Sequence, residues 1–177
     1  MSARKERHSR GTPALALLSK QNIPHTVHEF ARKPDQAGTH VDYGLEAADA
    51  MGVPPASVFK TLVWSTSDSS PPALLLALVP VDAQVSPKML AAAVGAKKVA
   101  LATSEAAERV SGSVVGAISP LGMRQRLPVV LDFSAEGLQE IFVSAGRRGL
   151  EICLAPRDLI AATNATVAPI AVAPGHS

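Results

Sequence analysis

Apolar residues recur at helical spacing in several short stretches of the chain. Two helices, over residues 13–21 and 88–94, are predicted by a Thr-Pro and a Ser-Pro pair at their starts. Each pair combines a preferred N-cap residue with proline at the first helical position. Further helices are expected at residues 45–51, from 103 or 104 to 110, at 134–140 and after Pro156.

Runs of aliphatic and β-branched residues between these stretches predict strands. Residues 74–81 are almost continuously apolar, which is typical of a strand buried on both faces. Strands and helices interleave without a long series of strand–helix–strand units. The pattern predicts one α/β domain of the mixed α+β kind, in which helices surround a mixed β-sheet or barrel. The other expected strands are residues 25–30, 58–64, 114–118, 129–133, 141–144 and 150–154.

The two ends of the chain differ in composition from the middle. The first eleven residues contain four basic residues and one acidic residue, a net charge of +3. The whole chain has a net charge of +2, so the remaining residues together carry −1. A flexible basic arm is therefore expected over residues 1–11, either as a solvated tail or as a contact for nucleic acid. The folded domain is expected over residues 12–170. The small, proline-containing stretch from residue 168 predicts fraying, with a tail over residues 171–177.

Composition restricts the class of protein. The chain is 47% hydrophobic and 18% charged, so it can bury a core and is not of the disordered class. Its apolar run at 73–79 is far too short to span a bilayer, and no secretory signal is present, so we expect a cytoplasmic protein without a membrane partner. Aromatic residues make up 3% of the chain, too few for extensive base-stacking platforms.

Lys60 is the first candidate for chemistry. The two-residue period of a strand places it on the same face as Val58 and Leu62. A lysine there can be structural, with its head extended to water or guarding a strand edge. It can equally direct a cation into a pocket, to hold a phosphate or ribose or to stabilise a developing oxyanion. Both interpretations remain open from the residues alone.

A glycine-rich segment over residues 112–122 is the second candidate. Gly116 within a presumed strand suggests a bulge or a close approach of the backbone. Exposed N–H groups in such a segment can bind an oxyanion or a phosphate. The alternative is an ordinary turn beside a kinked strand.

A second glycine-bracketed loop covers residues 144–149. It carries Arg147 and Arg148 just before the strand 150–154, on which Glu151 faces away from the leucines. Either arginine could hold an RNA phosphate, and Glu151 could anchor an amine or a hydroxyl. The alternative is a solvated hairpin turn.

Conventional catalytic centres are disfavoured. The lone cysteine, Cys153, excludes an internal disulfide and is better interpreted as a buried strand residue than as a nucleophile. His25, His28 and His40 have no metal-binding spacing, and no Gly-x-Ser-x-Gly elbow is present. We therefore expect neither a metal nor a cofactor.

Five segments in order carry a family resemblance: TPALALL, VFKTLV, VVGAISPLG, RLPVVLD and VSAGRRGLEI. This series resembles the YbaK/ProX editing family, bacterial aminoacyl-tRNA deacylases related to the insertion domain of prolyl-tRNA synthetase. The resemblance covers residues 12–170. It implies a barrel-like mixed sheet ringed by helices, with the 3′ aminoacyl-adenosine of tRNA bound in a central pocket and with no role for DNA.

The resemblance also implies roles for individual residues. Lys60 corresponds to the family's pocket lysine and Gly116 to its glycine loop, whose backbone would face the aminoacyl carbonyl; both are implied to be catalytic. Substrate-binding roles are implied for Phe30, Tyr43, Thr61, Ser119, Ser144, Gly146, Arg147 and Glu151.

Three of these positions depart from close YbaK relatives. Glu151 replaces aspartate, Phe30 replaces tyrosine and Tyr43 replaces phenylalanine, and such changes bear on amino-acid specificity more than on fold. The expected activity is removal of Cys from Cys-tRNA(Pro), and also from Cys-tRNA(Cys), in trans, with the substrate thiol attacking its own ester to leave as a thiolactone. One alternative is an Ala- or Ser/Thr-directed deacylase that uses water. Another is a tRNA- or synthetase-binding module, for which prolyl-tRNA synthetase is a possible partner. A third is a small-molecule binding protein.

Overall fold

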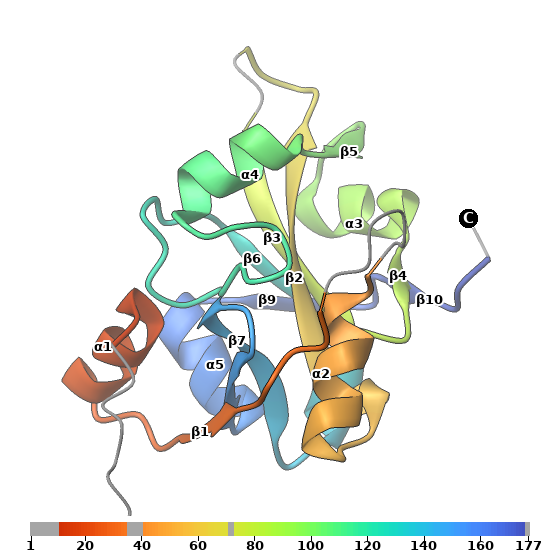
Figure 1. The fold of residues 1–177 in the computed structure, drawn as a ribbon. Coiled ribbons are helices and arrows are strands. Elements are labelled where there is room, and N and C mark those ends of the chain that lie inside the picture. Colours follow the sequence, from red (N-terminus) through yellow and green to blue (C-terminus); the bar gives the residue numbers. More distant parts are fainter. Residues whose placement is uncertain (1–10, 35–40, 71–72, 176–177) are drawn as a thin grey trace, which may run out of the picture.

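The computed structural model describes residues 11–34, 41–70 and 73–175, so residues 1–10 of the arm predicted over 1–11, and also His40, lie outside the described residues. Helices and strands alternate along the described chain (Figure 1). The elements are α1 (Pro13–Lys20), β1 (Thr26–Glu29), α2 (Tyr43–Met51), the 3₁₀ helix η1 (Pro55–Ser57), β2 (Val58–Thr66), β3 (Leu74–Pro80), β4 (Gln84–Val85), α3 (Pro87–Val94), β5 (Val99–Leu101), α4 (Ser104–Ser111), β6 (Val129–Asp132), η2 (Phe133–Gly137), β7 (Ile141–Arg147), β8 (Leu150–Leu154), α5 (Pro156–Thr163), β9 (Thr166–Ala168) and β10 (Ala171–Val172).

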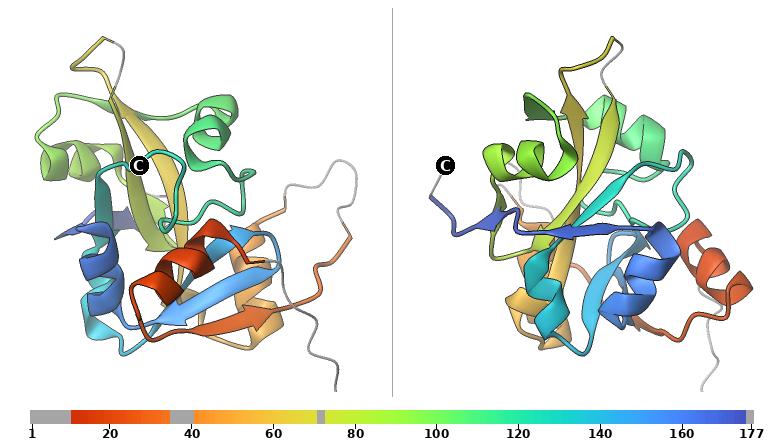
Figure 2. Two further views of the ribbon diagram at one scale, coloured as in Figure 1. Left: turned by 90° about the vertical axis from the view of Figure 1, so that its left-hand side faces the viewer. Right: turned by 180° about the vertical axis from the view of Figure 1, so that it is seen from behind.

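A mixed sheet forms the centre of the molecule. Its strand order is β1-β8-β7-β2-β3-β6-β9, with β5 paired to β2, and β4 and β10 form a separate two-stranded ladder. The pairs β2–β7, β3–β6 and β6–β9 are parallel, whereas β1–β8, β7–β8, β2–β3 and β2–β5 are antiparallel. The helices lie around this sheet, with α1 and α5 on one flank and α3 and α4 toward the far end of β2 and β3 (Figures 1 and 2). The predicted fold class is therefore confirmed.

The central strand β3 is buried on both faces, as its apolar run predicts. Leu76 and Leu78 belong to the largest core cluster, which also contains residues of α1, α4 and α5. Leu75 and Val79 belong to a second cluster, on the α3 side of the sheet. Each fully buried aliphatic side chain contributes roughly 1.5–3 kcal/mol of transfer free energy, so burial on both faces makes β3 the strand that anchors the sheet.

Strand β2 changes partners along its length, and this positions the functional site. It pairs with β3 from Phe59 to Ser65 on one side. On its other side it pairs with β7 only at Val58 and Phe59, and with β5 only from Trp64 to Thr66. Between these two pairings β2 has an open edge.

The helix starts agree with the sequence signals. Thr12 Oγ1 accepts a hydrogen bond from the N–H of Leu15 at 3.3 Å, and Ser86 Oγ accepts one from the N–H of Met89 at 3.4 Å. Helix α3 ends at Gly95, which has a φ of +68° that glycine adopts without steric cost. These local signals therefore place helices correctly because cap and terminus chemistry depends on neighbours in sequence.

Two predicted elements are wrong. Residues 114–118 form a loop and not a strand, because Gly116 has a φ of +85° and the peptide groups around it bind side chains and not a neighbouring strand. Residues 134–140 do not form an α-helix; the short 3₁₀ helix η2 occupies 133–137 and ends before the next strand. The strands β5 and β9, three residues each, are too short for their sequence pattern to have predicted them.

The expected fraying from residue 168 is also corrected. β9 pairs with β6, and Ala171 and Val172 pair with β4. The reason is a distant acceptor: Asp132 Oδ1 accepts hydrogen bonds from the N–H groups of Ile170 at 2.9 Å and of Ala171 at 2.8 Å. Ile170 is fully buried. A side chain 38 positions upstream thus holds this segment, which no local pattern reveals.

None of the helices within the described ranges combines the length and hydrophobicity that a span of the bilayer requires.

Asp132 provides a test of this C-terminal docking. Burial by itself would raise the pKa of Asp132, but hydrogen bonds from Ser134, Ile170 and Ala171 outweigh it and lower the pKa. A lowered folded-state pKa means that the stabilisation is present above pH 3.8 and is lost as pH falls. We expect Asp132→Ala to lower the free energy of unfolding at pH 7 by about 2–4 kcal/mol in urea titrations, because buried N–H donors lose their acceptor.

The matched control is Asp49→Ala, since Asp49 is exposed and its carboxylate, within the described part of the chain, pairs with the exposed Lys33 alone, Nζ to Oδ2 at 3.3 Å. We expect a change below about 1 kcal/mol for this variant. Equal effects of the two substitutions would contradict the proposed role of Asp132.

Candidate functional site

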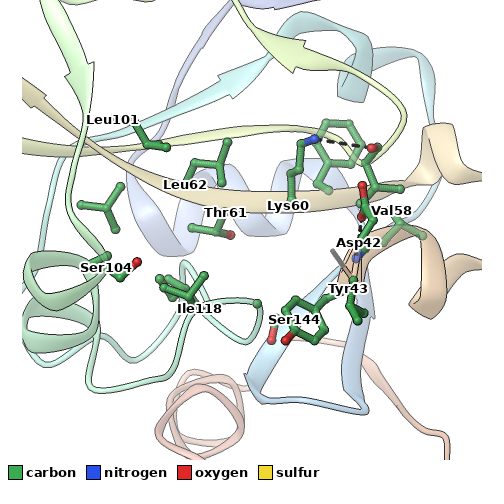
Figure 3. Close-up of a pocket in the computed structure, with 18 of the residues that line it drawn as sticks. Asp42, Tyr43, Val58, Lys60, Thr61, Leu62, Leu101, Ser104, Ile118 and Ser144 are labelled. Carbon is green, nitrogen blue, oxygen red and sulfur yellow. Dashed lines mark hydrogen bonds between the residues drawn. The ribbon is translucent and has the colours of Figure 1, made fainter. Parts of the chain in front are cut away.

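A cavity of about 330 Å³ lies along the open edge of β2. Its walls come from the start of α2, from β2, β5 and α4, from the loop over residues 114–118, and from β7 and β8. Figure 3 shows side chains from these elements converging on β2. Six of the residues implied by the family resemblance line it: Tyr43, Lys60, Thr61, Gly116, Ser144 and Glu151.

The backbone of Thr61 faces this cavity. The antiparallel register pairs Val58 with Val81, because the N–H of Val81 donates to the carbonyl of Val58 at 2.8 Å. In an antiparallel ladder successive residues turn their peptide groups to alternate sides. Those of Val58 and Lys60 therefore point toward β3, and those of Thr61 point away from it. The Oγ1 atom of Thr61 is also buried and has no hydrogen-bond partner among the described residues. The edge therefore offers unsatisfied donors and acceptors to a ligand.

Lys60 lies on the opposite face of β2 from Thr61 and on the same face as Leu62, as the strand period predicts (Figure 3). Its Nζ donates to the carbonyl of Val81 at 3.4 Å, a long hydrogen bond. Burial lowers the pKa of the Lys60 ammonium, while Asp42 and Asp82 oppose that change. Asp42 is itself occupied as the N-cap of α2. The ammonium is thus half-buried and weakly satisfied, so it is available to an anionic or carbonyl oxygen.

Glu151 is the other ionisable group of the cavity. It is 8% exposed and lies on β8, directly between Ser144 of β7 and His28 of β1 in the sheet. Burial raises the pKa of its carboxyl to about 8. No hydrogen bond or ion pair to this carboxyl occurs in the part of the chain that the structure describes. Such a group is neutral at pH 7 in the free protein and would gain a partner from a cationic ligand.

Side chains from three elements hold the loop that contains Gly116. The N–H of Val115 donates to Glu108 Oε1 at 2.9 Å, and Ser144 Oγ donates to the carbonyl of Ala117 at 3.0 Å. Any Cβ atom at position 116 would overlap the ring of Tyr43. The position therefore requires glycine for its positive φ and for the contact with Tyr43.

A bulge in β7 shapes the second predicted loop. Ser144 pairs with Glu151 and Arg147 with Leu150, so Ala145 and Gly146 have no partners in β8. The bulge redirects the strand before the two-residue turn at 148–149. The Arg147 side chain then points to solvent, where its Nη2 lies 2.9 Å from Glu29 Oε1 in an ion pair.

Four of the implied substrate-binding residues do not line the cavity: Phe30, Ser119, Gly146 and Arg147. Ser119 and Gly146 border a separate hollow near the start of α1, where Ser119 Oγ accepts from the N–H of Leu121 at 3.2 Å. Phe30 is tied by its backbone to Gly149 at 3.0 Å. Membership of a pocket loop thus does not decide which of its side chains face the pocket.

Sequence reasoning missed several cavity residues. The polar ones are Asp42 and Ser104. Both lie at helix starts: Asp42 caps α2 and Ser104 begins α4. The sequence predicts the helix start near residue 104. Nothing local indicates that α2 and α4 start beside the same strand. The apolar part of the wall includes Leu101, Ala102, Ala107, Val115 and Ile118.

Cys153 lies outside the cavity. It packs with Ala48, Val58 and Phe142 under α2, and burial raises the pKa of its thiol. Among the residues that are described, no three His, Cys, Asp or Glu side chains gather closely enough to hold a metal ion.

Comparisons with known proteins agree with this geometry. A model of the aminoacyl-tRNA editing domain matches residues 41–162. The chain is 31% identical, over 94% of its own length and 96% of the other's, to the "Putative Cys-tRNA(Pro)/Cys-tRNA(Cys) deacylase EbsC" of Enterococcus faecalis. It is also 29% identical, over 56% of its length, to a segment that makes up 17% of the proline–tRNA ligase of Trichlorobacter lovleyi.

Two solved structures share the fold. One is described as a "putative trans-editing enzyme for prolyl tRNA synthetase", with a TM-score of 0.74, 24% identity and coverage of 89% of this chain and 94% of that one. The other is the hypothetical protein APE2540, with a TM-score of 0.77, 19% identity and coverage of 90% and 99%. Taken with the sequence matches, these findings show that the chain belongs to the aminoacyl-tRNA editing domain family.

Proposed function

We propose that this protein is a trans-editing deacylase that removes cysteine from Cys-tRNA(Pro), and also from Cys-tRNA(Cys). The observation that carries the proposal is the combination, in one cavity, of a half-buried cation at Lys60, a buried carboxyl without a described partner at Glu151 and a glycine-containing loop at Gly116. The activity in the name of EbsC, which this chain matches over 96% of its length, supports the same conclusion. EbsC and this chain match over nearly the full length of both proteins, and this match supports action in trans.

The cavity accounts for each part of an aminoacyl ester. The α-ammonium of the ester pairs with Glu151, whose ionisation the ammonium favours. Lys60 contacts the terminal nucleotide and stabilises negative charge that develops near the ester. The N–H of Gly116 donates to the carbonyl oxygen. The open edge at Thr61 receives ribose hydroxyls, which satisfy its free backbone groups and its buried Oγ1.

The chemical step uses the thiol of the substrate. No histidine or cysteine lines the described cavity, and the hydroxyl of Ser144 is already engaged as a donor to Ala117. The substrate Sγ therefore attacks its own carbonyl carbon, so a C–S bond forms and the C–O bond to the ribose breaks. The thiol proton passes to the ribose oxygen, which leaves free tRNA and a cysteine thiolactone. The protein supplies orientation and electrostatic stabilisation.

The substrate-binding roles of Phe30, Ser119, Gly146 and Arg147 stay predictions, since these four residues lie outside the cavity. Prolyl-tRNA synthetase is a further proposed partner, supported by the likeness to a segment of proline–tRNA ligases.

Lys60→Ala tests the deacylase activity. We expect wild-type protein to release labelled cysteine from Cys-tRNA(Pro) faster than alanine or serine from the corresponding esters. Lys60→Ala should lower the rate by about 10²–10³-fold, because it removes a preorganised cation. Lys88→Ala is the control, since Lys88 is an exposed residue of α3 that does not line the cavity.

Preferred release of alanine or serine would show that this protein is an Ala- or Ser-directed deacylase, which must use water for the reaction. If none of the three amino acids is released faster than in buffer, the deacylase proposal fails and a tRNA-binding module remains. Recovery of a cysteine thiolactone, trapped before it hydrolyses, distinguishes the thiol route from the water route.

Glu151→Gln should change stability and activity in opposite directions. The folded protein keeps a proton on Glu151 up to about pH 8, whereas the unfolded chain releases it near 4.5. The unfolded state therefore binds fewer protons in this window, and the free energy of unfolding of the wild type falls as pH rises from 4.5 to 8. We expect the variant to avoid this loss and to be more stable at pH 8 by a few kcal/mol, at about 1.4 kcal/mol for each unit of pKa shift.

The activity of the same variant should be lower, because an amide cannot pair with the α-ammonium. For the wild type, kcat/KM corrected for spontaneous hydrolysis should rise with pH toward about 8, as the carboxylate of the free enzyme forms. Urea titrations and deacylation rates at matched pH values check both effects. A variant that keeps the wild-type pH profile would exclude Glu151 from binding the ammonium.

A further inference from the structure

The side chain of Arg148 connects the β7–β8 turn to the loop that contains Gly116. Its Nη2 donates to the carbonyl of Val115 at 2.6 Å and its Nε donates to the same oxygen at 3.2 Å. The positions are 33 residues apart, so this contact is tertiary. The neighbouring arginine, Arg147, instead pairs with Glu29 in solvent.

This contact fixes more than one carbonyl group. The carbonyl of Val115 and the N–H of Gly116 belong to the same peptide unit, which is planar, and in a trans peptide the two groups point in opposite directions. When Arg148 holds the carbonyl on its own side, the N–H must point to the other side. In the described chain this N–H has no hydrogen-bond acceptor, and Gly116 lines the cavity.

The guanidinium is itself held in place. Its central carbon lies 4.2 Å from the centroid of the Tyr43 ring, in a cation–π contact. The same ring fills the space where a Cβ atom at position 116 would lie. Glu108 binds the N–H of Val115 at 2.9 Å, so both polar groups of that residue are bound by charged side chains. The peptide has little freedom to rotate.

We propose that Arg148 is a positioning residue that directs the N–H of Gly116 at the carbonyl oxygen of the bound ester. This inference rests on the proposed deacylase function and deepens it. The positive charge also polarises the peptide, since a hydrogen bond accepted by a carbonyl strengthens donation by the N–H of the same unit. Arg148 acts through Gly116 and does not itself contact the reacting atoms.

The kinetic test compares Arg148→Ala and Arg148→Lys with the wild type in steady-state deacylation of Cys-tRNA(Pro). We expect Arg148→Ala to lower kcat by about 10–100-fold, less than the complete loss of an oxyanion donor, with little change in KM. Arg148→Lys keeps the charge but loses the two-pronged contact, so it should restore only part of kcat. Methylguanidinium added to Arg148→Ala should restore part of the rate.

The control is Arg157→Ala, because Arg157 is an exposed residue of α5 whose nearest carboxylate is that of its neighbour Asp158, at 3.9 Å. It should keep the wild-type kcat and show no response to methylguanidinium. This arm separates the role of Arg148 from a general loss of positive charge.

Amide NMR provides a readout that does not need turnover. In Arg148→Ala the amide signal of Gly116 should shift and exchange faster with solvent, while amides of the buried strand β3 stay as in the wild type. An active wild type together with an unchanged kcat in Arg148→Ala would overturn this inference alone. An inactive wild type would instead overturn the deacylase proposal, and an unmoved Gly116 signal would then also exclude Arg148 as the group that orients its peptide.

Discussion

The open edge of β2 is the constraint on which the rest of this structure depends. A central strand normally has all its peptide groups paired within the sheet. Here β7 leaves β2 after Phe59 and β5 joins it only at Trp64, so the peptide groups of Thr61, which point away from β3, face a cavity. β3 pairs with β2 along the whole of this stretch and is buried on both faces, which keeps the open segment extended. The site is therefore a gap in a sheet that is otherwise tightly packed.

The cavity combines groups that are unfavourable in the unliganded protein. Burial opposes the charged forms of both Lys60 and Glu151, and Thr61 Oγ1 has no described partner. Core packing around these groups offsets their cost, and a ligand with an ammonium, a carbonyl and hydroxyl groups would satisfy them. This chemistry explains how an aminoacyl ester can be recognised by few aromatic residues and by a surface without a large positive charge.

The two arginines of the β7–β8 turn illustrate how similar residues acquire different roles. They are adjacent in sequence, and either could have been the residue that faces the site. The bulge at Ala145 and Gly146 and the two-residue turn send Arg147 to Glu29 and Arg148 to the Val115 carbonyl. Gly116, Tyr43 and Arg148 consequently form one unit, although they come from three separate parts of the chain.

The sequence by itself determined the features that depend on neighbouring residues. These were the caps of α1 and α3, the two-sided burial of β3, the face of β2 on which Lys60 lies, and, through ordered motifs, the family and six of the cavity residues. Tertiary structure decided the loop at 114–118, the docking of Ile170 by Asp132, and the exclusion of Phe30, Ser119, Gly146 and Arg147 from the cavity. The physical reason is that distant hydrogen bonds shape these places: the bond from Ser144 to Ala117 spans 27 positions, that from Arg148 to Val115 spans 33, and that from Ala171 to Asp132 spans 39. Local periodicity contains no record of such pairings.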